Sequence, residues 1–139
     1  MLQMPRRVKF RKAQKGKNRG IASRGDKLIF GEFGLKAIEN GLIRANHMEA
    51  CRIVCARKMQ GAGKLWIKVF PRKPVTKKPA ETRMGKGKGD LSHWVCPVQR
   101  GKVVFELGGI PEDFAKSILR LVSFKLPFRT KFITRAGSH

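Results

Sequence analysis

The sequence predicts one domain of mixed helix and strand, preceded by a basic arm and interrupted by a basic loop. Its 139 residues suit a single domain that buries roughly two thirds of its unfolded surface. Two stretches show helical periodicity, and several short runs rich in β-branched and aromatic residues are typical of strands. We expect the arm at residues 1–25 and the folded domain at residues 26–139, with a functional loop at residues 71–92.

Charge restricts the class of partner. The chain has 32 Lys+Arg against 9 Asp+Glu, a net charge of +23. Positive charges in excess repel one another in a compact protein, and a polyanion such as nucleic acid relieves this repulsion best. A membrane is a poorer partner, because no stretch approaches the ~18 apolar residues of a spanning helix.

Targeting and redox signals are weak. Residues 1–7 lack the apolar core of a secretory signal. An Arg-rich, acid-free start also suits a mitochondrial presequence, but Pro5, Gly16 and Gly20 interrupt the amphipathic helix that one requires. Three cysteines are an odd number and too few for a disulfide scaffold, which favours a reducing, cytoplasmic setting.

The arm has no acidic residue and few apolar ones, chiefly Val8 and Phe10, so it cannot order itself by burial. A solvated tail is the simpler interpretation. The alternative is an arm that folds along a phosphate backbone. The residues expected to make those contacts are Arg6, Arg7, Lys9, Arg11, Lys12, Lys15, Lys17, Arg19 and Arg24.

Residues 26–43 alternate weakly between apolar and polar, which predicts one or two strands. The first helix follows, with Asn46 as its N-cap and Glu49 in the capping-box position three residues later. Gly61 and Gly63 end it. Its apolar stripe is formed by Met48, Cys51, Cys55 and Met59.

The second half begins with a predicted strand at residues 65–70, stopped by Pro71 and Pro74. Residues 94–98 and 103–107 are predicted to pair as a hairpin through the turn at Arg100-Gly101. Because Pro97 lacks an N–H, the first of these strands should lie at an edge or carry a bulge.

The second helix is predicted to start at Pro111, with Glu112 and Asp113 in its first turn, and to end before Pro127. Residues 128–133 then suit a final strand. The predicted apolar stripe of this helix consists of Phe114, Ile118, Leu121 and Val122.

The basic loop at residues 71–92, between the predicted strands at residues 65–70 and 94–98, cannot contribute to folding. Glycines lose much backbone entropy on ordering and its lysines repel one another, so an anionic partner would have to order it. Arg83 offers a fork that matches phosphate, and the absence of aromatic residues favours phosphate contacts over base stacking. A solvated surface loop is the simpler alternative. The candidate contact residues are Lys77, Lys78, Arg83, Met84, Gly85, Lys86, Gly87, Lys88 and Gly89.

Other motifs give weaker signals. Residues 61–64 resemble a phosphate-binding loop, but Leu65 follows where Ser or Thr is needed, and the segment leads from helix to strand. No nucleophile and base share a diagnostic context. We therefore expect no enzyme, cofactor, bound metal or small-molecule substrate. The rival is a metal or thiol site built from His47, Cys51, Cys55, His93 and Cys96, although cysteines on an apolar helix face usually pack as small hydrophobic residues.

Several strings also match a known family. Residues 64–71 (KLWIKVFP), 83–89 (RMGKGKG), 9–12, 16–20, 30–37 and 102–106 resemble the bacterial-type large-subunit ribosomal protein L-sixteen, over essentially the whole chain. Cys51, Cys55 and the terminal residues 137–139 depart from the pattern without touching these strings.

The resemblance implies an α+β fold of the hammerhead type, with two helices packed on an antiparallel or mixed sheet. It implies a structural role in the large ribosomal subunit, in the cytoplasm or an organelle, with ribosomal RNA and neighbouring ribosomal proteins as partners. It further implies that the arm binds ribosomal RNA near the peptidyl-transferase region. The loop would lie near aminoacyl-site or peptidyl-site transfer RNA, and the family is associated with late subunit assembly. A free-standing RNA chaperone outside the ribosome is the alternative.

Overall fold

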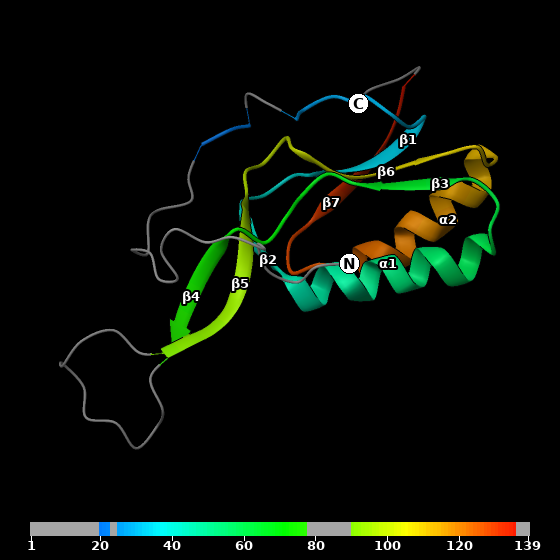
Figure 1. Ribbon diagram of the computed structural model, residues 1–139. Coiled ribbons are helices and arrows are strands. Elements are labelled where there is room, and N and C mark those ends of the chain that lie inside the picture. The colour runs from blue at the N-terminus through cyan, green and yellow to red at the C-terminus, as the bar shows by residue number, and fades with distance from the viewer. Residues whose placement is uncertain (1–19, 23–24, 78–89, 136–139) are drawn as a thin grey trace.

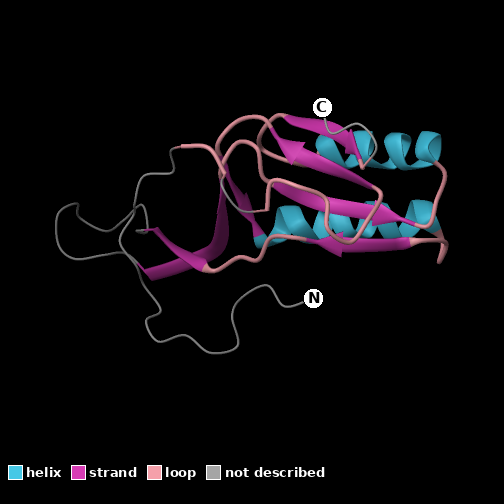
Figure 2. Ribbon diagram, turned by 90° about the horizontal axis from the view of Figure 1, so that it is seen from above, coloured by secondary structure: helices cyan, strands magenta, loops and turns pink. Residues whose placement is uncertain are grey.

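Both helices pack on one face of a four-stranded antiparallel sheet, and a second, three-stranded sheet extends from it (Figures 1 and 2). The computed structural model describes residues 20–22, 25–77 and 90–135. The predicted α+β fold, with helices on an antiparallel sheet, is confirmed. The elements of the described residues are β1 (Phe33–Ala37), β2 (Gly41–Arg44), α1 (Ala45–Met59), β3 (Lys64–Ile67), β4 (Lys73–Lys77), β5 (Asp90–Val98), β6 (Val103–Gly108), α2 (Glu112–Ser123) and β7 (Thr130–Thr134).

The order of strands is β3-β6-β1-β7 in the larger sheet and β2-β5-β4 in the smaller one. β1 pairs with β6 and β7, so that Leu35 lies opposite Phe105 on one side and Phe132 on the other. Leu35 and Phe105 are buried, and they share the face that meets the helices. The core therefore lies between this face and the two helices.

The predicted hairpin between residues 94–98 and 103–107 is wrong. β5 pairs with β2 and β4, whereas β6 pairs with β1 and β3 in the other sheet. β1 pairs with β6 in the larger sheet and β2 pairs with β5 in the smaller one, so both the β1–β2 and the β5–β6 segments pass from one sheet to the other. The turn at Gly101 is held at this crossing, because the Gly101 N–H donates to the Ala37 carbonyl at 2.6 Å and the Arg100 N–H to Asn40 Oδ1 at 2.7 Å.

Pro74 and Pro97 both lie inside strands, at positions where a strand neighbour is present on one side only. Pro74 does not stop a strand as predicted but lies inside β4, an edge strand, where a missing N–H is tolerated. β5 is the middle strand of its sheet, yet β4 pairs only with residues 90–95. Pro97 is therefore flanked by β2 alone, and at this point the strand is locally an edge, as expected.

Helix α1 carries the predicted stripe but not the predicted cap. Met48, Cys51, Cys55 and Met59 are all buried, as expected. Asn46 is not the cap, because β2 ends at Arg44 and runs directly into the helix, so Asn46 already lies in the first turn. The Arg44 N–H instead donates to Nδ1 of His47 at 3.2 Å, and Glu49 binds the Arg52 guanidinium.

Helix α2 starts at Glu112, one residue later than predicted, with Pro111 as its N-cap. Glu112 and Asp113 lie in its first turn, as expected. Its buried face matches the predicted one only in part: Ile118 and Val122 are buried, and Phe114 packs partly buried against the core. Leu121 is 39% exposed and Leu119 is fully buried, so this part of the predicted stripe is wrong. The buried residues are Ala115, Ile118, Leu119 and Val122. The helix ends at Ser123, ahead of Pro127, and the predicted final strand is β7.

Candidate RNA interface

Strand pairing shortens the loop expected at residues 71–92, because residues 73–77 form β4 and residues 90–92 belong to β5. Lys77 at the end of β4 lies opposite Asp90 at the start of β5, so residues 78–89 begin and end at neighbouring positions. Figure 1 shows β4 and β5 extending away from the larger sheet and the helices. The fold thus places the attachment points of this loop at one extremity of the molecule.

Most of the RNA-contact residues expected from the sequence lie outside the described residues. Of the expected set, only Lys77 has a described backbone. The expected residues that lie outside the described ranges are Arg6, Arg7, Lys9, Arg11, Lys12, Lys15, Lys17, Arg19, Arg24, Lys78, Arg83, Met84, Gly85, Lys86, Gly87, Lys88 and Gly89.

The described residues at the end of the arm are fastened to the body. Ile21 forms a parallel bridge with Arg100, and the Ala22 N–H donates to the Arg100 carbonyl at 2.9 Å. Next, the Val103 N–H donates to the Gly25 carbonyl at 2.7 Å. The chain is therefore fixed on the β5–β6 turn, where the two sheets meet, before it continues to β1.

Residues 25–31 cross the larger sheet on the face away from the helices, and a buried carboxylate holds them there. Oε1 of Glu106 accepts the backbone N–H groups of Ile29, Phe30 and Gly31 at 3.0, 2.9 and 2.8 Å. Its other oxygen lies 3.4 Å from Nζ of Lys68. Such charge-assisted bonds are stronger than neutral ones, so they offset part of the cost of burying the charge.

Arg135 fixes the same segment from its other side. Its guanidinium donates to the carbonyls of Ile29 and Gly31, both at 3.0 Å. The backbone of residues 29–31 is thereby bound through both its N–H and its C=O groups. Sequence reasoning missed this arrangement, and the available signal was a single carboxylate, Glu106, inside the apolar run of residues 103–107.

Cations dominate the described surface. The segment from α2 to residue 135 exposes all of its Lys and Arg side chains. They are Lys116, Arg120, Lys125, Arg129, Lys131 and Arg135. The exposed carboxylates of the described residues are Glu32, Glu39, Glu112 and Asp113.

The cysteines of α1 are packed into the core. Burial, and then the neighbouring Cys55, raise the pKa of Cys51 to about 12, and burial raises the pKa of Cys55 to about 11. Both thiols are therefore protonated at neutral pH, the form that neither attacks nor ligates. Among the residues that the structure describes, no three His, Cys, Asp or Glu side chains gather as a metal site.

His47 acts at the start of α1. Burial, and then the nearby charge of Arg44, lower the pKa of His47 from its ordinary value, which favours the neutral ring. A neutral imidazole has one acceptor nitrogen, and here it is Nδ1, which accepts the Arg44 N–H. This contact is local to the helix terminus.

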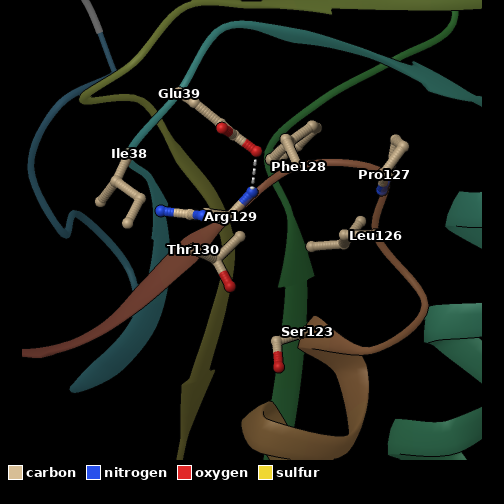
Figure 3. Close-up of a pocket in the computed structure, with 8 residues that line it drawn as sticks. All are labelled: Ile38, Glu39, Ser123, Leu126, Pro127, Phe128, Arg129 and Thr130. Atoms are coloured by element: carbon tan, nitrogen blue, oxygen red, sulfur yellow. Dashed lines mark hydrogen bonds between the residues drawn. The ribbon is translucent and has the colours of Figure 1, made fainter.

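A shallow depression of about 490 Å³ lies between the β1–β2 turn and the connection from α2 to β7 (Figure 3). Its charged residues are Glu39 and Arg129. Oε1 of Glu39 accepts the backbone N–H of Arg129 at 2.7 Å, drawn as the dashed line in Figure 3. The carboxylate thus ties the turn to the start of β7.

A membrane span is not found either, since neither helix in the described ranges has the length and apolar character to cross a bilayer.

An antiparallel α+β body, paired strands that anchor a basic loop, and a large excess of cations are typical of a small RNA-binding protein. A family model described as "Ribosomal protein L16p/L10e" matches residues 5–133, and the chain therefore belongs to this family of ribosomal proteins. The match confirms the resemblance seen in the sequence. It makes the protein a structural constituent of the large ribosomal subunit that acts in translation, with ribosomal RNA and other ribosomal proteins as partners.

Proposed function

We propose that this protein binds large-subunit ribosomal RNA near the peptidyl-transferase region and presents its basic loop to transfer RNA in the aminoacyl site. The observation that carries this proposal is the pairing of Lys77 with Asp90, which attaches both ends of the loop at one extremity of the fold. A loop held in this way can reach past the body of the protein to a second RNA.

The arm and the exposed cations of the α2–β7 segment serve the first RNA. Residues 1–25 carry only basic charge, and they join the body where Ile21 and Ala22 bind Arg100. Their role is to neutralise ribosomal RNA phosphates, which fixes position and orientation without reading sequence. The body then serves as the scaffold between arm and loop, in a cytoplasmic subunit, and takes part in its late assembly.

Arg83→Ala tests the role of the loop. We expect the variant to be incorporated into large subunits at normal occupancy, because the arm and body are unchanged. The rate of aminoacyl-transfer-RNA accommodation should fall by about tenfold or more, since a hydrogen bond to a charged group contributes ~1.5–3 kcal/mol. Occupancy is measured by sedimentation, and accommodation by rapid kinetics on purified subunits.

Two further variants serve as controls. Arg83→Lys keeps the charge but loses the bidentate fork, so its rate should be intermediate. Arg57→Ala removes one exposed charge from the last turn of α1 and should leave accommodation unchanged. Loss of incorporation by Arg83→Ala, with normal accommodation in the residual subunits, would show that the loop is only an assembly anchor.

A free-standing RNA chaperone is separated from this proposal by sedimentation. A ribosomal constituent stays with the large subunit through a high-salt wash, whereas a chaperone is released.

A further inference from the structure

Phe30 lies on the outer face of the larger sheet, and 58% of it is exposed. A Phe side chain is ordinarily buried, because transferring its apolar surface out of water is favourable. Here the backbone is held in the exposing position by three N–H bonds to Glu106 and two carbonyl bonds to Arg135. The exposure is therefore built into the fold and is not that of a loose loop.

The ring has an aromatic and a cationic neighbour. Its centroid is 6.0 Å from that of Trp66, with the planes inclined by 17°. Nζ of Lys68 is 4.4 Å from the same centroid, within the range of a cation–π contact. Both neighbours come from β3 and its continuation, where Trp66 lies opposite Glu106 in the pairing with β6.

We infer that Phe30, supported by Trp66 and Lys68, is a stacking site for an unpaired base of ribosomal RNA. Every base offers a π-face, and single-stranded RNA is recognised by splaying its bases onto aromatic side chains. A platform that is already ordered keeps the entropic cost of binding low. This site differs in chemistry from the basic loop, whose contacts are to phosphates.

Charge favours RNA over a protein as the occupant of this site. Exposed Ile29 also lies beside Phe30 and is compatible with either partner. However, the exposed Arg135 adjoins the same backbone segment, and the carboxylate of Glu106 is fully buried beneath it and paired with Lys68. A base stacked on Phe30 would bring a flanking phosphate to Arg135. The inference rests on the RNA binding of the family and is independent of the transfer-RNA proposal.

The first test compares normal and abasic RNA. Phe30→Ala should weaken binding of a single-stranded oligoribonucleotide by about 5- to 150-fold, the range seen when one base–aromatic stack is removed. Binding of an abasic oligomer of equal length and charge should not change. Phe30→Leu keeps an apolar side chain without a π-face and should also lose affinity, whereas Phe30→Trp should retain it.

Phe124→Ala is the matched control, since Phe124 is 70% exposed at the end of α2 and should affect neither ligand. Equal losses with the abasic oligomer would overturn the inference, and so would wild-type affinity in Phe30→Leu.

The second test uses assembled large subunits, with p-benzoylphenylalanine in place of Phe30 and, as a control, in place of Phe124. Irradiation should cross-link position 30 to one unpaired nucleotide of the ribosomal RNA. A cross-link to a ribosomal protein would make the site a protein-docking surface, and no cross-link from position 30 would leave it solvated. Either result overturns the inference, whatever the outcome for Arg83→Ala.

Discussion

Glu106 has an unusual position for a carboxylate, because it is fully buried in β6 with apolar residues on both sides along the strand. Burying a charge is costly unless it is paired and hydrogen-bonded. Oε1 accepts three backbone N–H groups, whereas Oε2 accepts no hydrogen bond among the described residues and is compensated by its ion pair with Lys68. The residue thereby fastens the segment that enters β1 to the sheet, across a sequence separation of 75 to 77 residues.

Glu106→Gln should destabilise the protein by about 2–4 kcal/mol, because the amide keeps the shape but leaves the largely buried Lys68 ammonium without its counter-charge. The measurement is the midpoint of urea unfolding at constant m-value. Glu32→Gln is the same substitution at an exposed position and should change stability by less than about 0.5 kcal/mol. Equal midpoints for the two variants would contradict a structural role for Glu106.

Among the elements, α2 shows how a helical pattern leaves its buried face undecided. The stripe predicted from the sequence and the stripe observed share Ile118 and Val122, which lie one turn apart. Phe114 and Leu121 extend this row on one side, and Ala115 and Leu119 extend it on the other. Both arcs have helical spacing. Packing on α1 and the sheet buries the second arc, and a contact from Cys51 Sγ to the Val122 carbonyl marks this interface.

Leu119→Ala and Leu121→Ala form a matched pair, because they make the same change two residues apart on one helix. The first should cost about 2–5 kcal/mol, since it leaves a cavity in a fully buried site. The second should cost less than about 1 kcal/mol, because Leu121 is 39% exposed. Thermal unfolding of both variants provides the comparison. A larger loss for Leu121→Ala would mean that the opposite arc faces the core.

The pairing of β5 and β6 was likewise not decided by local sequence. β5 and β6 adjoin in sequence and are joined by a turn that suits a hairpin, yet each pairs with the β1–β2 segment in a different sheet. The turn residues alone are compatible with both arrangements. Hydrogen bonds from the turn to Ala37 and Asn40 stabilise the crossing, and these partners lie about sixty residues away.

At the scale of the whole molecule, charge is the dominant property. Nine carboxylates cannot pair with 32 cations, and Glu106 is committed to the interior while Glu49 binds Arg52. The remaining positive charge repels itself in the free protein and is neutralised when the protein binds RNA. The partner therefore contributes to the stability of the compact state.

Affinity for isolated ribosomal RNA should fall steeply with salt, with a log–log slope of about −0.7 to −0.9 for each neutralised phosphate. Substitution of Lys116 and Arg120 by Gln should make the slope shallower by about 1.5, because both side chains are exposed on α2. Filter binding across a salt series measures both slopes.

The matched control for charge alone replaces Arg57 and Lys58 by Gln. Both residues are exposed at the end of α1. Equal changes in the two double variants would show diffuse attraction without defined contacts, and a wild-type slope near zero would contradict phosphate neutralisation.

The sequence by itself determined the features that depend on near neighbours. The stripe of α1, the acidic first turn of α2 and the edge-like position of Pro97 were all predicted correctly. Net charge indicated a polyanion, and the family match identified ribosomal RNA. The loop and arm contacts remain predictions.

Only the tertiary structure decided which strands pair, which arc of α2 is buried, and that Glu106 holds Phe30 on the outer face. The physical reason is the sequence distance over which each interaction acts. Periodicity, caps and proline act over a few residues, so they are written in the local sequence. Choices among equivalent partners depend on contacts between distant segments, such as the hydrogen bond from Phe30 to Glu106 across 76 residues, which local patterns do not encode.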